Sequence, residues 1–212
     1  ALSLNAKGER YMNEDCDGQS LTNQIVRQPN KTVYQIFDAS WPQMVQNQPI
    51  SHGMPNPVTM DQAATQQFLD GAKAQPSGFL ACFDTLEELF EFLGLPVDAA
   101  MASVERYNEL CEKGVDEDFG KRADRMAPVK QPPFYAAKMP TLGYQTFYGS
   151  VCCDYNMHAV DMDNRPIPGL YVGGTIMGSR FWHIYPNTTM GMNHAGALCY
   201  GRLAAKNAVA GI

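Results

Sequence analysis

The stretch Pro168–Gly178, PGLYVGGTIMG, combines a short apolar run with a glycine turn. Leu-Tyr-Val at 170–172 is apolar and strand-prone, so we expect the end of a buried strand there. Gly173 and Gly174 then remove the side chains at a point where the backbone has to approach another group closely. The question is which group approaches these glycines, and which other residues belong to the same site.

The composition fits a globular protein with a real core. The chain has 212 residues, 45% of them hydrophobic, and its 18 glycines and 14 prolines are too few for a disordered chain. The formal net charge of −6, without a basic run, argues against nucleic acid or an anionic membrane as partner. We find no signal peptide and no apolar run long enough to cross a bilayer. The chain starts at Ala1, so we expect a trimmed or partial chain from the cytoplasm or a bacterial cell envelope.

The cysteine and histidine spacing predicts no metal site. None of the six cysteines forms a C-x-x-C pair, and the four histidines have no zinc-type spacing beside them. Cys152 and Cys153 are adjacent, which makes a disulfide between them strained. We therefore expect buried thiols in a reducing compartment.

The N-terminal region reads as strands followed by helices. We expect short strands over 1–5 and 10–14, a helix over 20–27 and a half-buried strand over 32–38. Pro42 is placed in the first turn of a helix after Asp38, and another helix is expected from near Thr59 to Gly71.

Residues 84–114 predict a helical hairpin. Thr85 and Glu88 have capping-box spacing, with the hydroxyl on the N3 amide and the carboxylate on the cap amide. Gly94 and Gly114 end the two helices. One face of the first helix carries Leu86, Leu89, Phe90 and Leu93, and the apolar side of the second carries Met101, Val104 and Leu110.

A polar, proline-rich passage over 116–139 marks the expected domain boundary. Short strands are expected after it, over 133–139, 145–154, 158–162 and 169–174, and a helix rich in small residues over 191–210 closes the chain.

Seven motifs in one order resemble the C-terminal part of the fumarate reductase and succinate dehydrogenase flavoproteins, closest to their flavocytochrome-like and urocanate-reductase-like branch. They are GERYMNED (8–15), TVYQIFD (32–38), DTLEELFEFLG (84–94), VERYNELCEKGVDEDFGK (104–121), PPFYA (132–136), NRPIPGLYVGG (164–174) and GALCYGRLAAKNA (196–208).

The resemblance implies an α+β fold with two parts. Residues 1–143 would be most of a capping domain for the substrate, and residues 144–212 the last segment of a Rossmann-type FAD-binding domain. The N-terminal βαβ unit of such a domain carries G-x-G-x-x-G, which holds the FAD pyrophosphate. That motif is absent from this sequence. We therefore expect this chain alone to have an incomplete FAD site and to be inactive.

The resemblance also assigns residues to the cofactor. The strand end would pass against the dinucleotide, with a threonine where the family usually has an acidic residue. The start of the last helix would direct its amides and its positive end at flavin N1 and the C2 oxygen. The alternative is that these glycines only make turns and packing contacts. The cofactor-binding candidates are Gly173, Gly174, Thr175, Gly191, Met192 and Asn193.

The family's fumarate chemistry does not carry over. The proton-donating Arg falls on Gly18, the clamping His on Gln145, and a further Arg superposes best on Thr188. A dicarboxylate would lose charge-assisted bonds worth about 1.5–3 kcal/mol each. We therefore expect a substrate other than fumarate.

The segment SRFWHIYP (179–186) offers a replacement. Its aromatic walls suit a flatter, less charged acceptor, such as an enone or an aryl acrylate. Hydride would pass from reduced flavin N5 to one carbon, and a Tyr or His would give a proton to the other. In the alternative, the aromatic residues Phe181, Trp182 and Tyr185 are interface core and Arg180 is a surface ion-pair partner. The catalytic candidates are Tyr148, Arg180, His183 and Tyr185.

Two functions stay open at this point. The first is part of an FAD-dependent oxidoreductase acting on a carbon–carbon bond, with a small unsaturated substrate and an electron donor that the sequence does not identify. The second is a degenerate capping module that binds a ligand or a partner without catalysis.

Overall fold

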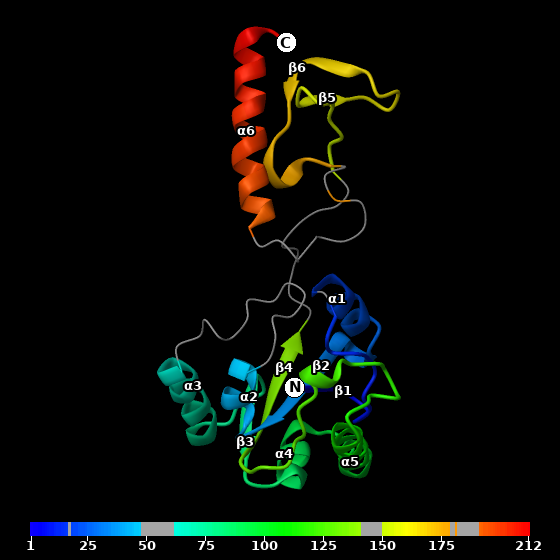
Figure 1. Cartoon of the computed structure of the whole chain (residues 1–212), viewed down its shortest axis with the longest axis vertical. Coiled ribbons are helices and arrows are strands. Elements are labelled where there is room, and N and C mark those ends of the chain that lie inside the picture. The colour runs from blue at the N-terminus through cyan, green and yellow to red at the C-terminus, as the bar shows by residue number, and fades with distance from the viewer. Residues whose placement is uncertain (17, 48–61, 141–149, 179–180, 182–190) are drawn as a thin grey trace. The chain divides into compact units, whose positions relative to one another are not determined.

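The computed structural model describes residues 1–16, 18–47, 62–140, 150–178, 181 and 191–212 (Figure 1). The chain divides into two compact units, Ala1–Thr141 and Leu142–Ile212. Each unit has its own buried core, so each is described by itself.

The first unit is built on a four-stranded antiparallel sheet. Its strand order is β1-β2-β4-β3, with β1 (Leu2–Asn5), β2 (Thr32–Asp38), β4 (Phe134–Pro140) and β3 (Leu80–Phe83). The predicted strand over 32–38 is confirmed, but it is not half-buried. Ile36 packs into one cluster and Phe37 into another, because helices cover both faces of the sheet.

Helices α4 (Leu86–Leu93) and α5 (Val97–Lys113) form the predicted hairpin. The left-handed Gly94 and Gly114 end them, as expected. Glu88 departs from the predicted capping box, because its carboxylate accepts a hydrogen bond from the Thr85 hydroxyl (2.9 Å). The other half of the cap is present, since the Glu88 amide donates to Thr85 Oγ1 at 3.3 Å.

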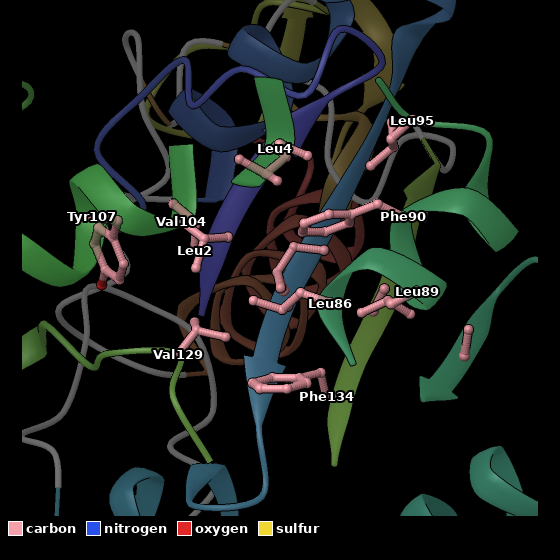
Figure 2. Close-up of a cluster of buried hydrophobic side chains, with 14 residues drawn as sticks. Leu2, Leu4, Leu86, Leu89, Phe90, Leu95, Val104, Tyr107, Val129 and Phe134 are labelled. Carbon is pink, nitrogen blue, oxygen red and sulfur yellow. The ribbon is translucent and has the colours of Figure 1, made fainter. Parts of the chain in front are cut away.

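The hairpin covers one face of the sheet. In Figure 2, Leu86, Leu89 and Phe90 of α4 gather with Leu2 and Leu4 of β1. Tyr107 of α5 is fully buried in the same cluster, a position that the sequence analysis did not assign to the core. The reason is that the tyrosine hydroxyl has a buried ammonium partner, described below.

The described residues of this unit also form α1 (Gly18–Val26), α2 (Trp41–Asn47) and α3 (Gln62–Ala74), with the 3₁₀ turns η1 (Pro29–Lys31) and η3 (Ala123–Arg125). The helix expected to end at Gly71 runs on to Ala74. The strand expected over 10–14 is wrong: only an isolated bridge between Leu4 and Arg10 forms, because Arg10 and Glu14 turn inward to buried ionic partners.

The second unit contains a β-hairpin and one long helix. Strands β5 (His158–Val160) and β6 (Pro166–Tyr171) pair antiparallel, and α6 (Met192–Ala210) runs alongside β6 (Figure 1). Between them lies η4 (Gly174–Ile176). The buried core of this unit lies between the hairpin region and α6. Its residues are Met157, Ala159, Val172, Met177 and Ala204.

Two strand predictions in this unit need correction. Strand β6 is exposed along Pro166–Leu170, and burial begins only at Val172, although β5 and α6 lie beside it. Of the expected strand over 145–154, the described part makes only isolated bridges, at Val151 and Cys153.

Among the described residues, no helix combines the length and the apolar character that a membrane span needs.

Candidate functional site

Helix α6 is what approaches the first glycine of the turn. A Cβ added at Gly173 would lie 3.2 Å from the Cα and from the amide nitrogen of Gly201. Gly174 is left-handed (φ +83°), and a Cβ there would lie 3.9 Å from the Cβ of Ala197. The glycines therefore bring the strand end against the helix, while the side chain of Thr175 is exposed in η4.

The N-terminus of α6 is a regular amide end. Gly191 caps it in the left-handed conformation (φ +78°), and the amide of Ala195 donates to the Gly191 oxygen at 2.9 Å. The N-cap residue Gly191 has no side chain that could cap the helix, and no acidic residue lies in the first turn, which contains Met192 and Asn193. An added Cβ at Gly191 would meet no described atom within 4 Å. The dipole of this 19-residue helix places partial positive charge at this end, which favours an anionic or electron-rich group.

The six cofactor candidates therefore fall into two places on one unit. Gly173, Gly174 and Thr175 form the turn that packs on α6, and Gly191, Met192 and Asn193 form the start of α6. The left-handed Gly174 and Gly191 and the positive end of the α6 dipole suit a dinucleotide that carries negative charge.

The catalytic candidates Tyr148, Arg180, His183 and Tyr185 lie outside the described residues. Their described neighbours are paired: the amide of Val151 donates to the Ile176 oxygen (3.2 Å), and the amide of Gly178 donates to the Val151 oxygen (2.8 Å). A Cβ added at Gly178 would lie only 2.8 Å from the Ser150 oxygen. The chain that leaves the Tyr148 segment therefore runs beside the chain that enters the Arg180 segment.

Two positions that bear on fumarate chemistry can be partly placed. Gly18 begins α1, and a Cβ added there would meet no described atom within 4 Å. Among the described atoms a side chain at this position would meet no clash, but glycine brings no positive charge. Gln145 and Thr188 lie outside the described residues. Phe181, one of the aromatic residues of the 179–186 segment, is buried (8% exposed).

A buried ionic network in the first unit was missed by the sequence analysis. Arg10 Nη2 lies 2.9 Å from Glu14 Oε2 and 2.7 Å from Asp116 Oδ2, and these three side chains are at most 7% exposed. Lys121 Nζ lies 3.1 Å from Glu14 Oε2 and donates to the Tyr107 hydroxyl at 2.9 Å. The i,i+4 spacing of Arg10 and Glu14 was the one available signal, since Asp116 and Lys121 are more than a hundred residues away.

The network shifts the pKa values of its carboxyl groups. Burial alone would raise the pKa of Asp116, but hydrogen bonds from Arg10 and from the amides of Lys121 and Phe119 outweigh it and lower the pKa to about 2. Burial likewise opposes ionisation of Glu14, and the charges of Lys121 and Arg10 outweigh it, so its pKa is lowered. Arg10, Glu14, Asp116 and Lys121 are therefore charged and paired at neutral pH, which points to a structural role.

Other reactive groups form no cluster. Among the described residues, no three metal-ligating side chains come together. The six cysteines form no disulfide, and the expectation that they are buried is wrong for most of them: Cys82 is buried, whereas Cys152 and Cys199 are exposed.

The sequence matches a family described as "FAD binding domain" over residues 1–191. It is 35% identical to digoxin reductase of Eggerthella lenta over 127 residues, which cover 60% of this chain and 22% of the relative. It is 31% identical to vinyl phenol reductase of Lactiplantibacillus plantarum, with 66% of this chain and 29% of the relative covered. Identity to urocanate reductase of Eggerthella lenta is 27%, with 99% and 31% covered. The chain thus spans 22–31% of the length of these relatives.

The fold matches that of a solved flavoprotein. The open conformation of a flavocytochrome c3 fumarate reductase superposes with a TM-score of 0.64 at 24% identity, covering 99% of this chain and 32% of that one. This likeness supports the mixed helix-and-sheet fold that the resemblance implied.

Proposed function

This chain belongs to the family of FAD-binding domains, which confirms the resemblance seen in its motifs, and on that premise we propose that it is part of an FAD-dependent oxidoreductase that reduces or forms a carbon–carbon double bond. FAD is the cofactor of the family. The names of the relatives describe reductases of digoxin, vinyl phenol and urocanate, which supports an unsaturated small molecule as substrate.

The observation that carries this proposal is the packing of the Gly173–Thr175 turn on α6, whose N-cap residue is the left-handed Gly191. Gly173, Gly174 and Thr175 would lie along the dinucleotide. Gly191, Met192 and Asn193 would direct main-chain amides at the flavin ring. When bound, FAD supplies hydride transfer at its N5 atom.

The amide end of α6 would raise the reduction potential of the flavin. Reduction places negative charge near N1 and the C2 oxygen, and main-chain amides with a helix dipole behind them stabilise that charge. The absence of an acidic residue from the first turn of α6 keeps this effect unopposed from within the helix.

The two segments with the catalytic candidates would supply the proton and orient the substrate. In the sequence, Tyr148 is two residues before Ser150, and Arg180 is two residues after Gly178. The bridge between Val151 and Met177 is parallel, so the two segments leave it in opposite directions, and their meeting at one place is part of the proposal. We assign proton donation to carbon to Tyr148, His183 or Tyr185, and orientation of the substrate to Arg180.

The substrate we propose is an enone or an aryl acrylate and not fumarate. Gly18 brings no positive charge to the position that corresponds to an arginine in the family's fumarate-reducing members. An aromatic or conjugated acceptor needs less charge compensation than a dicarboxylate, and we assign its apolar contacts to the aromatic residues of the 179–186 segment.

These residues do not identify the electron donor. We propose that the 212 residues alone bind FAD weakly and do not turn over substrate, because they lack the phosphate-binding glycine motif. The competing function is a degenerate module without catalysis. It is favoured by Gly18 and Gln145, which stand where the family's fumarate-reducing members carry an arginine and a histidine.

The test is anaerobic mixing of the complete, FAD-loaded and reduced protein with fumarate, an aryl acrylate or a cyclic enone, followed by flavin absorbance. We expect one of the two conjugated acceptors to oxidise the flavin at least about tenfold faster than fumarate does, a difference of about 1.4 kcal/mol in barrier. Tyr148→Phe, His183→Gln and Tyr185→Phe identify the proton donor by slowing this step. Tyr155→Phe, at a side chain that is 98% exposed, is the matched control. Fumarate as the best acceptor would refute the substrate assignment, and no acceptor at all would favour the degenerate module.

A further inference from the structure

We propose that Gly173 is a positioning residue: its missing side chain sets how closely α6 lies against the strand end, and thereby fixes the amide end of α6 at the flavin. This inference rests on the proposed function, in which the start of α6 faces the flavin. It gives Gly173 a different role from direct contact with the dinucleotide.

The constraint at Gly173 is steric. Its backbone is extended (φ −151°, ψ 160°), a conformation that any residue adopts, so no special backbone angle requires glycine here. A Cβ at this position would lie 3.2 Å from the Cα and the nitrogen of Gly201. Both are helix backbone atoms that cannot rotate away as a side chain does, so a larger residue has to push the helix by a few tenths of an ångström.

The contact between Gly173 and Gly201 lies where a displacement moves α6 as a whole. Gly201 is near the middle of α6, about 14 Å along the axis from Met192 at a rise of 1.5 Å per residue. Close to this contact, Tyr200 and the buried Ala204 pack into the core of the second unit, so the helix is held on the same side. A hydrogen-bonded helix transmits such a displacement to its first turn.

The other partner of the contact provides the control. A Cβ added at Gly201 itself would meet no described atom within 4 Å. Gly201→Ala therefore alters the other residue of this contact without adding an atom between the strand end and α6. It also raises the helix propensity of that position.

The experiment compares Gly173→Ala, Gly173→Val and Gly201→Ala in the complete FAD-loaded protein, by FAD titration and by redox potentiometry. We expect Gly173→Ala to weaken FAD binding about threefold or more and to lower the flavin potential, Gly173→Val to do both more strongly, and Gly201→Ala to leave both at the parent values. Ala197→Val, which enlarges the helix side of the same turn, should shift the potential in the same direction and replaces Gly173→Ala if that variant does not fold.

Two controls separate the possible failures. Val172→Ala removes a buried contact next to Gly173 without touching Gly201. If it lowers the potential as much as Gly173→Ala, loss of stability explains the effect and the inference is overturned. If Met192→Pro changes the potential while Gly173→Ala and Ala197→Val do not, the inference fails and the proposed function stands. If none of these variants changes the potential, the proposed placement of the flavin fails as well.

Discussion

Glu14 is the residue on which the segment before α1 depends. Its carboxylate accepts hydrogen bonds from the Ser3 amide (3.1 Å) and from two nitrogens of Arg10 (3.0 and 2.9 Å), and it pairs with Lys121. Buried ion pairs of this kind add little net stability when intact, but removing one partner leaves the other charges uncompensated. The network therefore holds residues 10–16 in one place, just before Gly18.

We expect Glu14→Gln to destabilise the folded protein by about 3 kcal/mol or more, since it leaves Lys121 and Arg10 with an uncharged neighbour in a buried site. Glu105→Gln, on the exposed side of α5, should change the free energy of unfolding by less than about 0.5 kcal/mol. Urea denaturation measures both. A Glu14→Gln variant as stable as Glu105→Gln would show that the network is dispensable.

The same residues predict loss of stability in acid. The folded-state pKa of Asp116 is lowered to about 2 and that of Glu14 is also lowered, whereas the unfolded values are about 3.9 and 4.3. Their stabilising contribution is present above the unfolded values and is lost as pH falls through the folded ones. We expect the unfolding free energy to fall between about pH 4 and pH 2, and to fall less in Asp116→Asn. An equal slope in both proteins over that range would contradict this assignment.

At the scale of elements, sequence patterns predicted the helices and strands whose formation depends on interactions between residues close in the sequence. Strand β2 and the α4–α5 hairpin follow from alternation, helical spacing and glycine ends, all within a few residues. The expected strand at 10–14 failed because Arg10 takes its partner from Asp116, a contact that no local pattern encodes. Likewise, the pairing of β2 with β4 and the cover on both sheet faces arise from long-range packing.

The cap of α4 gives a prediction at this scale. We expect Thr85→Ala to cost about 1 kcal/mol, because the Glu88 amide loses its acceptor at the helix start. Thr22→Ala is the matched change: the Thr22 hydroxyl donates to the Gly18 oxygen at 2.9 Å within α1, and alanine is the better helix former there. Thermal unfolding should therefore separate the two variants. Equal losses for both would mean that the cap does not stabilise α4.

At the scale of the whole molecule, the sequence identified the family and the segments of the site but not how the site is packed. The motifs along the chain led to FAD, and the family match agrees. They did not show that Gly173 faces Gly201, because that contact joins a strand end to the middle of a helix by backbone shape alone. The roles of Tyr148, Arg180, His183 and Tyr185 remain predictions, since these residues lie outside the described structure.

The central claim is that the start of α6 meets the flavin, and Met192→Pro tests it most directly. Proline removes one amide yet is tolerated in the first turn, so the helix should stay largely formed. The loss of one main-chain hydrogen-bond donor to the flavin, worth about 1–3 kcal/mol, should weaken FAD binding about tenfold or lower the reduction potential of the flavin. In the complete protein, potentiometry should show a lower potential for Met192→Pro and the parent value for Glu105→Ala. Equal potentials and equal affinities in the two variants would contradict the account.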